Sequence, residues 1–256
     1  MTPSRLASAA LLALGALASL SPVLASTPSE LFQNGNSAYE QGKFQEAANA
    51  YGTILGYGVA DPRVLYNLAN AEYKLGRLGA AILHYERALR LDPSDQDPRD
   101  NLELARGMIR DRIPETEIPY PVKVVKDRLD TLPVDLLSVL FLCVHFVAGG
   151  LVGALPLATG STRRRVLGYG AAAAGVCALV AGGALYYTIQ DRTAAHAIVM
   201  ADRVNVLSGP SADNTVLFTV HEGTRLEVRN RRGGWYQVSL PNAMSGWVPS
   251  GVVERV

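Results

Sequence analysis

The chain has 256 residues and a formal net charge of +1, because 24 Lys and Arg nearly balance 23 Asp and Glu. This balance gives no reason to expect nucleic acid as a partner. Hydrophobic residues make up 48% of the sequence and concentrate in three apolar runs, which favours a small multi-part membrane protein over one large globule.

The first apolar run has the form of a secretory signal. Arg5 precedes an Ala- and Leu-rich run over residues 6–20, and Val23-Leu24-Ala25 places small or β-branched residues where a signal peptidase cleaves. We expect residues 1–25 to be a signal peptide. An uncleaved anchor that starts inside the cell is the alternative, and either form exports the segment after Ala25.

The segment after Ser29 repeats itself every 34 residues. The matched pairs are Asn36 and Asn70, Tyr39 and Tyr73, Gly42 and Gly76, Ala47 and Ala81, and Tyr51 and Tyr85. This period resembles that of the tetratricopeptide (TPR) family of helix-turn-helix repeats. The resemblance implies an all-α domain over residues 29–112, with repeats at 29–62 and 63–96 and a capping helix within 98–112. Gly52, Gly56 and Gly58 weaken the second helix of the first repeat, which we expect to be short or frayed.

In TPR proteins the first helix of each pair usually lines a groove that binds a peptide or another protein. The 34-residue register carries this groove to Phe32, Gln33, Asn36, Tyr39, Glu40, Tyr66, Asn67, Asn70, Tyr73 and Lys74. Asn and Tyr bond an extended backbone or stack on side chains without requiring one sign of charge. An alternative is that Tyr39 and Tyr73 pack between repeats. Because Phe32, Asp97 and Asn101 stand where basic residues would be needed, we do not expect a carboxylate clamp.

Residues 113–133 connect this domain to the second apolar run. Pro114, Pro119 and Pro121 predict an extended linker, while Val122 to Leu132 fits either a short helix at the membrane surface or a plain connector. The apolar runs 134–157 and 166–189 are both long enough for a helix to cross about 30 Å of hydrocarbon. We therefore expect two transmembrane helices in contact with the lipid bilayer.

The loop between the two spans, residues 158–165, carries Arg163, Arg164 and Arg165. Short loops rich in Lys and Arg stay in the cytoplasm. Residues 26–133 and 190–256 should therefore both lie outside the cytoplasm, as the signal peptide also predicts for the first of them.

Small residues predict how the spans pack. Gly170, Ala174, Ala178 and Gly182 recur every four residues in the second span, and Gly149 and Gly153 form a comparable stripe in the first. We expect these faces to meet within the hairpin or in a complex. His145 has no charged partner inside either span, which argues against proton transport. Cys143 and Cys177 are interpreted as packing residues, with a bridge between the spans as the alternative.

From Ala195 the sequence changes to short β-rich runs separated by turns. Val204 to Ser211, Gly233-Gly234-Trp235 and Ser245-Gly246-Trp247 resemble, in type and order, the motifs of bacterial SH3 domains. The resemblance implies an all-β SH3-like barrel over residues 195–256. Period-two alternation directs Leu226, Val228 and Val238 inward.

Three aromatic residues of this segment are candidates for partner binding: Trp235, Tyr236 and Trp247. In related domains turn aromatics line a groove for peptides or cell-wall glycopeptide. An alternative for the two tryptophans is packing in the core or at its rim, because so small a domain needs its large apolar groups for stability.

We find no enzyme signature in the sequence. The four histidines, His84, His145, His196 and His221, lie in three different parts of the chain and lack a metal-ligand spacing. A phosphate-binding Gly-rich loop with Lys, a nucleophile elbow and a Cys-His pair within one domain are also missing. The sequence therefore favours binding over catalysis, with no catalytic residue, cofactor or metal site. An unrecognised envelope hydrolase is the third class considered.

The order of signal, TPR pair, two-span hairpin and SH3-like domain resembles the BatE-type membrane proteins of aerotolerance operons. The resemblance implies a multi-pass protein of the bacterial cytoplasmic (inner) membrane, with partners that carry von Willebrand factor A domains and a MoxR-type ATPase. Our hypothesis is a non-catalytic scaffold for membrane or envelope proteins. The alternative is a sensor or tether that binds peptidoglycan through the SH3-like domain.

Overall fold

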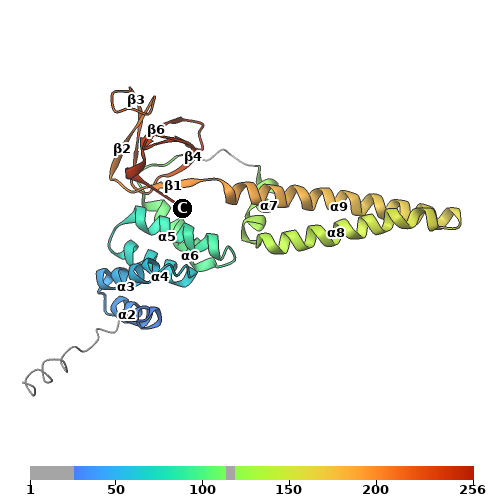
Figure 1. The fold of residues 1–256 in the computed structure, drawn as a ribbon, viewed down its shortest axis with the longest axis horizontal. Helices are drawn as coiled ribbons and strands as arrows, with labels where there is room; N and C mark the ends of the chain where they lie inside the picture. The colour runs from blue at the N-terminus through green and yellow to red at the C-terminus, as the bar shows by residue number, and fades with distance from the viewer. Residues whose placement is uncertain (1–25, 114–118) are drawn as a thin grey trace, which may run out of the picture.

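The computed structural model describes residues 26–113 and 119–256, so the predicted signal peptide and part of the predicted linker lie outside the described residues. Figure 1 shows a stack of helices α2 to α6, a long hairpin formed by α8 and α9, and a β domain that lies against the helix stack. The predicted succession of an all-α region, two apolar helices and an all-β domain is confirmed.

The helix stack contains α2 (Pro28–Glu40), α3 (Phe44–Gly56), α4 (Pro62–Lys74), α5 (Leu78–Leu91) and α6 (Gln96–Met108). Thr27 and Glu30 form a reciprocal capping box at the start of α2. Gly42 and Gly76, with φ of +76° and +77°, turn the chain between the helices of each pair. Helix α6 stands where the first helix of a third repeat would stand.

Helix α3 has 13 residues, so the expectation of a short or frayed helix is wrong. Its glycines Gly52 and Gly56 are exposed, whereas Tyr51 and Ile54 are each only 1% exposed. The packing of the buried face offsets the low helix propensity of glycine. The helix ends at Gly56, two residues before Gly58 enters the left-handed region at φ +78°.

Helices α8 (Val134–Ala154) and α9 (Ser161–Thr193) form an antiparallel hairpin joined by a short 3₁₀ turn, η1 (Leu155–Leu157). By length and composition, Val134–Leu157 and Ser161–Asp191 are each able to cross a membrane. The predicted loop 158–165 is too long, because α9 already begins at Ser161 and includes the three arginines. Arginine is a good helix former, and Gly160 at φ +93° completes the turn before the helix.

The two hairpin helices meet through only part of the predicted small-residue surface. An added Cβ at Gly182 would lie 3.1 Å from the Phe141 ring, and one at Gly170 would lie 3.7 Å from Leu151. Ala174 and Ala178 are half-buried on the same side of α9. Gly149 and Gly153 are exposed with no neighbour within 4 Å, so they do not form the contact within the hairpin. The bulkier α8 residues Phe141 and Leu151 form it instead.

Cys143 and Cys177 are both free thiols, so the alternative of a bridge is wrong.

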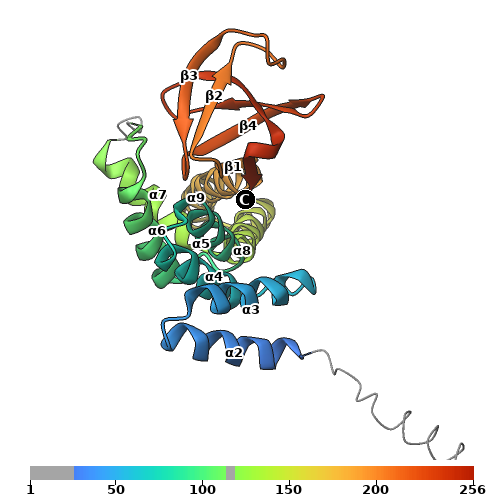
Figure 2. The same ribbon diagram turned by 90° about the vertical axis from the view of Figure 1, so that its left-hand side faces the viewer.

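Helix α7 (Tyr120–Thr131) lies across the end of the hairpin that faces the helix stack, as Figures 1 and 2 both show. Of the two interpretations of Val122 to Leu132, the helix is therefore the one observed. Tyr120, Val122 and Val125 on this helix are exposed.

The C-terminal domain is a seven-stranded antiparallel sheet with the order β3-β2-β6-β5-β4-β1-β7. The strands are β1 (His196–Val199), β2 (Arg203–Leu207), β3 (Val216–His221), β4 (Arg225–Arg232), β5 (Trp235–Ser239), β6 (Ser245–Pro249) and β7 (Val253–Arg255), with the 3₁₀ turn η2 (Ser250–Val252) before β7. Every strand contributes to one buried core, so the sheet curls around it. Leu226 and Val238 are fully buried there and Val228 packs beside them, as expected.

The helix stack and the β domain share a core through strand β1. Ala197 and Val199 point into the core of the β domain, while Ile198 belongs to the buried cluster of Ile82, Leu83 and Tyr85 on α5. These three consecutive β1 residues are all 0% exposed. Because successive residues of a strand point to opposite faces, β1 is buried on both sides.

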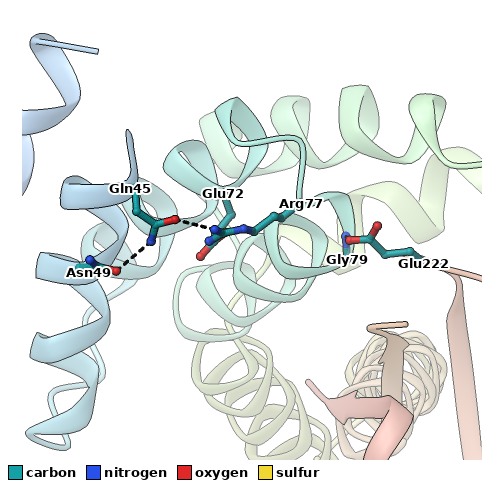
Figure 3. A network of polar contacts seen from close by, with 6 residues as sticks. All are labelled: Gln45, Asn49, Glu72, Arg77, Gly79 and Glu222. Carbon is teal, nitrogen blue, oxygen red and sulfur yellow. Dashed lines mark hydrogen bonds and ion pairs between the residues drawn. The ribbon is translucent and has the colours of Figure 1, made fainter. Parts of the chain in front are cut away.

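The turn between β3 and β4 adds a second contact. Glu222 accepts a 2.8 Å hydrogen bond from the backbone N–H of Gly79, in the first turn of α5 (Figure 3). Helix α5 has no side-chain cap of its own, so the β domain supplies a carboxylate where the helix has free N–H groups. Gly79 permits the approach, since a Cβ there would lie 2.9 Å from Val199 O. Gly223 abuts Ile82 and Ile109 in the same way.

Polar contacts surround this junction. Asp111, just after α6, accepts hydrogen bonds from the backbone N–H of His221 (2.6 Å) and the Thr224 hydroxyl (2.7 Å), and its other oxygen lies 2.7 Å from His221 Nδ1. Burial alone would raise the pKa of Asp111, but the bonds from Thr224 and His221 outweigh it and hold the pKa below its usual value. Arg87 pairs with Glu254 on β7 at 2.8 Å. The two modules therefore form one continuous body.

Replacing Ile198 with alanine should loosen this body, because it removes buried carbons that contact α5. We expect a loss of about 2–4 kcal/mol in the free energy of unfolding of the full chain in detergent. Hydrogen exchange should localise the loss to α5 and β1. The control Val216→Ala, on the exposed face of β3, should change stability by less than about 0.5 kcal/mol. Unchanged exchange of α5 in Ile198→Ala would contradict the shared core.

We expect His84 to make the stability of the folded chain dependent on pH. Burial, and then the charge of Arg87, lower its pKa to about 4. Its Nδ1 is buried without a hydrogen-bond partner among the described residues. The unfolded chain binds a proton at His84 near the ordinary pKa of about 6.5, whereas the folded chain does so only near 4, so stability falls as pH falls between these values.

The variant His84→Gln removes this titration. Between pH 7 and pH 5, the loss of unfolding free energy should be smaller in the variant than in the native chain by about 2 kcal/mol. Denaturant unfolding at the two pH values measures the difference. Equal losses in the two proteins would show that His84 does not contribute to the pH dependence.

Candidate protein-binding groove

Helices α2 and α4 form a polar cleft with a volume of about 260 Å³. Its walls are Asn36, Tyr39, Glu40, Asn67 and Asn70, with Tyr51 of α3 at its base. Five of these six residues belong to the groove predicted from the sequence. Helix α6 continues the same face by one further repeat position.

Two matching hydrogen-bond networks run along this face. Asn36 Oδ1 accepts bonds from the Tyr51 hydroxyl (2.8 Å) and the Asn67 amide (3.1 Å). One repeat later, Asn70 Oδ1 accepts bonds from the Tyr85 hydroxyl (2.6 Å) and the Asn101 amide (3.0 Å). We call these four asparagines the amide ladder.

The ladder fixes the orientation of the Asn36 and Asn70 side chains. Tyr51 and Tyr85 are each 1% exposed, and burial raises the pKa of both, to about 12 for Tyr51, so their hydroxyls stay protonated and donate. Within the described residues, the Nδ2 groups of Asn36 and Asn70 donate no hydrogen bond to the protein. Each can therefore donate to a carbonyl of a bound extended chain.

The aromatic residues of the predicted groove pack as well as line it. The Phe32 and Tyr51 rings are 6.0 Å apart, the Tyr66 and Tyr85 rings 6.2 Å, and the Tyr39 and Phe44 rings 5.2 Å. Tyr39 and Tyr73 are half-buried against the helix cores, which is the packing role considered as an alternative. Tyr39 also borders the cleft, so the two roles coexist in this residue. Lys74 is exposed at the rim.

Sequence reasoning missed the contribution of α6. Leu104 and Met108 are 62% and 60% exposed on this helix, and Tyr73 approaches Met108 with its hydroxyl 3.0 Å from the sulfur. Adding one 34-residue step to Asn67, Asn70 and Lys74 gives Asn101, Leu104 and Met108, so the signal was present. The α6 surface at Leu104 and Met108 is thus apolar, whereas the cleft itself is polar.

The β domain presents its two tryptophans on its outer surface. The pairing of β5 with β6 places Trp235, Gln237 and Trp247 on the face opposite the core residues Val238 and Val248. Both tryptophans are half-exposed and neither belongs to the buried core. Tyr236 points the other way, packs against the core and lies 5.7 Å below the Arg231 guanidinium. The three candidate residues therefore do not form one surface.

Within the described residues, no group of three or more His, Cys, Asp and Glu side chains is arranged to hold a metal ion. The His221 and Asp111 pair is half-buried and is used to join the two modules.

Comparison with known proteins agrees with this architecture. Residues 32–96 match the tetratricopeptide repeat family, and residues 202–254 match the bacterial SH3 domain family. The chain therefore contains TPR repeats and a bacterial SH3 domain.

Individual relatives cover smaller parts of the chain. A Bacillus subtilis (strain 168) protein named "Putative N-acetylmuramoyl-L-alanine amidase YrvJ" is 32% identical over 82 residues, which are 31% of this chain and 16% of that protein. The crystal structure of the Sgt2 TPR domain from Aspergillus fumigatus is 29% identical, with a TM-score of 0.30, over 33% of this chain and 58% of that one. The chain thus spans less than two thirds of either protein.

A double-mutant cycle tests the amide ladder. Asn70→Leu leaves the buried Tyr85 hydroxyl without its acceptor and should cost about 1–3 kcal/mol of unfolding free energy. Tyr85→Phe removes that hydroxyl, so the double variant should lose less than the sum of the two single variants, by about 1 kcal/mol. Denaturant unfolding of the four proteins measures this coupling, and strictly additive losses would contradict the bond.

Proposed function

We propose that the chain is a non-catalytic scaffold of the bacterial envelope. Helices α8 and α9 anchor it in the cytoplasmic membrane, and the TPR groove and the bacterial SH3 domain hold protein partners outside the cytoplasm. The aerotolerance-type assembly, with von Willebrand factor A-domain proteins and a MoxR-type ATPase, is the partner set that we propose from the resemblance in architecture.

The arrangement of charge and modules along the hairpin carries this proposal. The TPR and SH3 modules are docked to each other at one end of the hairpin, and Arg163 to Arg165 lie at the other end (Figure 1). A cluster of three guanidinium groups beside an apolar helix resists passage through a bilayer. The arginine end would therefore stay in the cytoplasm and the docked modules would project outward.

The groove favours an extended protein segment as its ligand. The amide ladder offers donors at its centre for backbone carbonyls, and Leu104 and Met108 offer an apolar surface at one end. Glu40 and Lys74 supply one charge of each sign, so the groove has no strong preference for an acidic or a basic peptide.

A cell-wall tether is the second candidate, and the two half-exposed tryptophans of the SH3 domain favour it. Trp235 and Trp247 leave an aromatic surface on the SH3 domain that is free to stack on a sugar ring or a peptide. The Bacillus subtilis relative that matches 31% of this chain is named a putative N-acetylmuramoyl-L-alanine amidase. Retention of the full chain on purified sacculi, lost in Trp235→Ala with Trp247→Ala, would favour the tether over the scaffold.

A photo-crosslinking residue placed at Tyr73 in living cells should trap a membrane or envelope protein, because this position borders the proposed groove. The same residue at Thr53, which is exposed on α3 away from the groove, is the control and should trap much less. A reporter fused at Val256 should be active only outside the cytoplasm. Equal crosslinking at both positions would contradict the groove, and a cytoplasmic reporter would contradict the topology.

A further inference from the structure

A pocket of about 350 Å³ lies where the helix stack, the β domain and the ends of α7 and α9 converge. Helices α5 and α6 form one wall, Lys126 and Asp130 of α7 and Thr188 and Asp191 of α9 form another, and Arg225 of β4 and the C-terminal Val256 complete it. No sequence pattern predicts this pocket, because its walls come from segments far apart in the chain.

The pocket has more cationic groups than its acids balance. Arg106 and Arg225 both approach the single carboxylate of Glu86, at 2.7 and 3.3 Å. Lys126 pairs with Asp130 at 2.6 Å, and Arg90 bonds to the Val256 oxygen at 2.6 Å. Asp191 lines the pocket as the other acid. Burial, and then the charge of Arg225, lower the pKa of His196, which keeps this ring neutral at pH 7.

Arg99 is the cation best placed for a further ligand. One of its terminal nitrogens donates a 2.7 Å bond to Pro93 O, while its Nε is buried without a hydrogen-bond partner among the described residues. Its Nε has almost no accessible surface, so a ligand in the pocket would bond to the terminal nitrogens of the guanidinium. Among the described residues no carboxylate pairs with Arg99, and an oxyanion would take charge-assisted bonds from these nitrogens. The planar guanidinium is especially suited to phosphate oxygens.

The surroundings of the pocket indicate where that phosphate would come from. Thr188 and Asp191 end the apolar part of α9, and α8 starts at Val134, four residues after Asp130. Tyr186 is 68% exposed at the same end of α9, and Tyr120 is 78% exposed on α7. Exposed tyrosines are typical of the layer where lipid headgroups meet water. Val122 and Val125 also leave α7 with an exposed apolar face.

We propose that this pocket binds the phosphate of a glycerophospholipid headgroup, with Arg99 as its principal donor and Arg106 and Arg225 beside it. The proposal rests on the membrane placement put forward under the proposed function. A bound headgroup would link the helix stack, the β domain and the hairpin at one point. It would thereby set the orientation of the groove relative to the membrane surface.

Native mass spectrometry of the full chain, purified in detergent and titrated with phosphatidylglycerol, tests this proposal. Arg99→Gln should weaken binding about tenfold, the loss expected for one charge-assisted hydrogen bond. Arg99→Lys keeps the positive charge but not the planar set of N–H donors, so its lipid affinity should lie between those of the native chain and Arg99→Gln. Arg63→Gln, which removes an equal charge from an exposed ion pair with Asp61, should bind as the native chain does. Thermal unfolding of each variant establishes that it is folded.

Two outcomes would overturn the proposal. Equal affinity of Arg99→Gln and the native chain would exclude Arg99 as the donor. Equal affinity for glycerol 3-phosphate and for phosphatidylglycerol would mean that the site takes a free phosphate and needs no lipid. The reporter at Val256 tests the membrane topology separately. If the reporter lies outside the cytoplasm and Arg99→Gln binds lipid as the native chain does, only the pocket proposal is refuted. If the reporter lies in the cytoplasm, the membrane topology is refuted.

Discussion

The burial of strand β1 on both faces is the constraint on which the architecture depends. Ala197 and Val199 complete the core of the β domain, and Ile198 completes a core in the helix stack. A small β domain has few apolar groups, so a strand that serves two cores gives stability that neither module would gain alone. It also fixes the groove and the outer face of the SH3 domain relative to each other. Flexibly linked TPR and SH3 modules would have no such relation.

The elements themselves could be predicted from the sequence because their signals are local. A 34-residue period, two apolar runs and the SH3 motifs each identify a segment without reference to the rest of the chain. The docking could not be predicted, because Ile198 and α5 are more than a hundred residues apart and nothing local pairs them. The continuous apolar run Ala197-Ile198-Val199 was a partial signal, since a strand with one solvated face would alternate. Gly79 gave no signal of the docking in the sequence, because its lack of a side chain matters only once Val199 is known to lie against it.

The groove was predictable to the extent that it follows the repeat register. Asn36, Asn67 and Asn70 emerged from that register, but the hydrogen bonds that orient them required Tyr51 and Tyr85 from the second helices of the pairs. Asn101 entered the sequence analysis only as a position that lacks a basic residue, and Leu104 and Met108 were missed because their helix was treated as a cap. The prediction that Gly149 and Gly153 of the first apolar helix pack against the second helix was wrong within the hairpin for a different reason. Small residues permit close approach, but Phe141 and Leu151 fill the space against Gly182 and Gly170, so the hairpin did not need Gly149 and Gly153 on the same side.

The shared core also constrains how the chain would cross a membrane under the proposed function. Its two halves come from segments before α8 and after α9, so any arrangement that leaves Ile198 against α5 must return the chain to the side from which it left. An antiparallel pair of crossings meets this requirement. A single crossing would put Ile198 on one side of the bilayer and the α5 residues of its cluster on the other, and would expose both to water. Under the proposed function, positive charge at the turn would then decide which side that is. The charge of Arg163 to Arg165 and the docking through β1 are thus independent observations, one electrostatic and one from packing, and both agree with the proposed topology. A segment before α2, whether cleaved or retained, does not alter this requirement, because every residue of the shared core lies on the C-terminal side of α2.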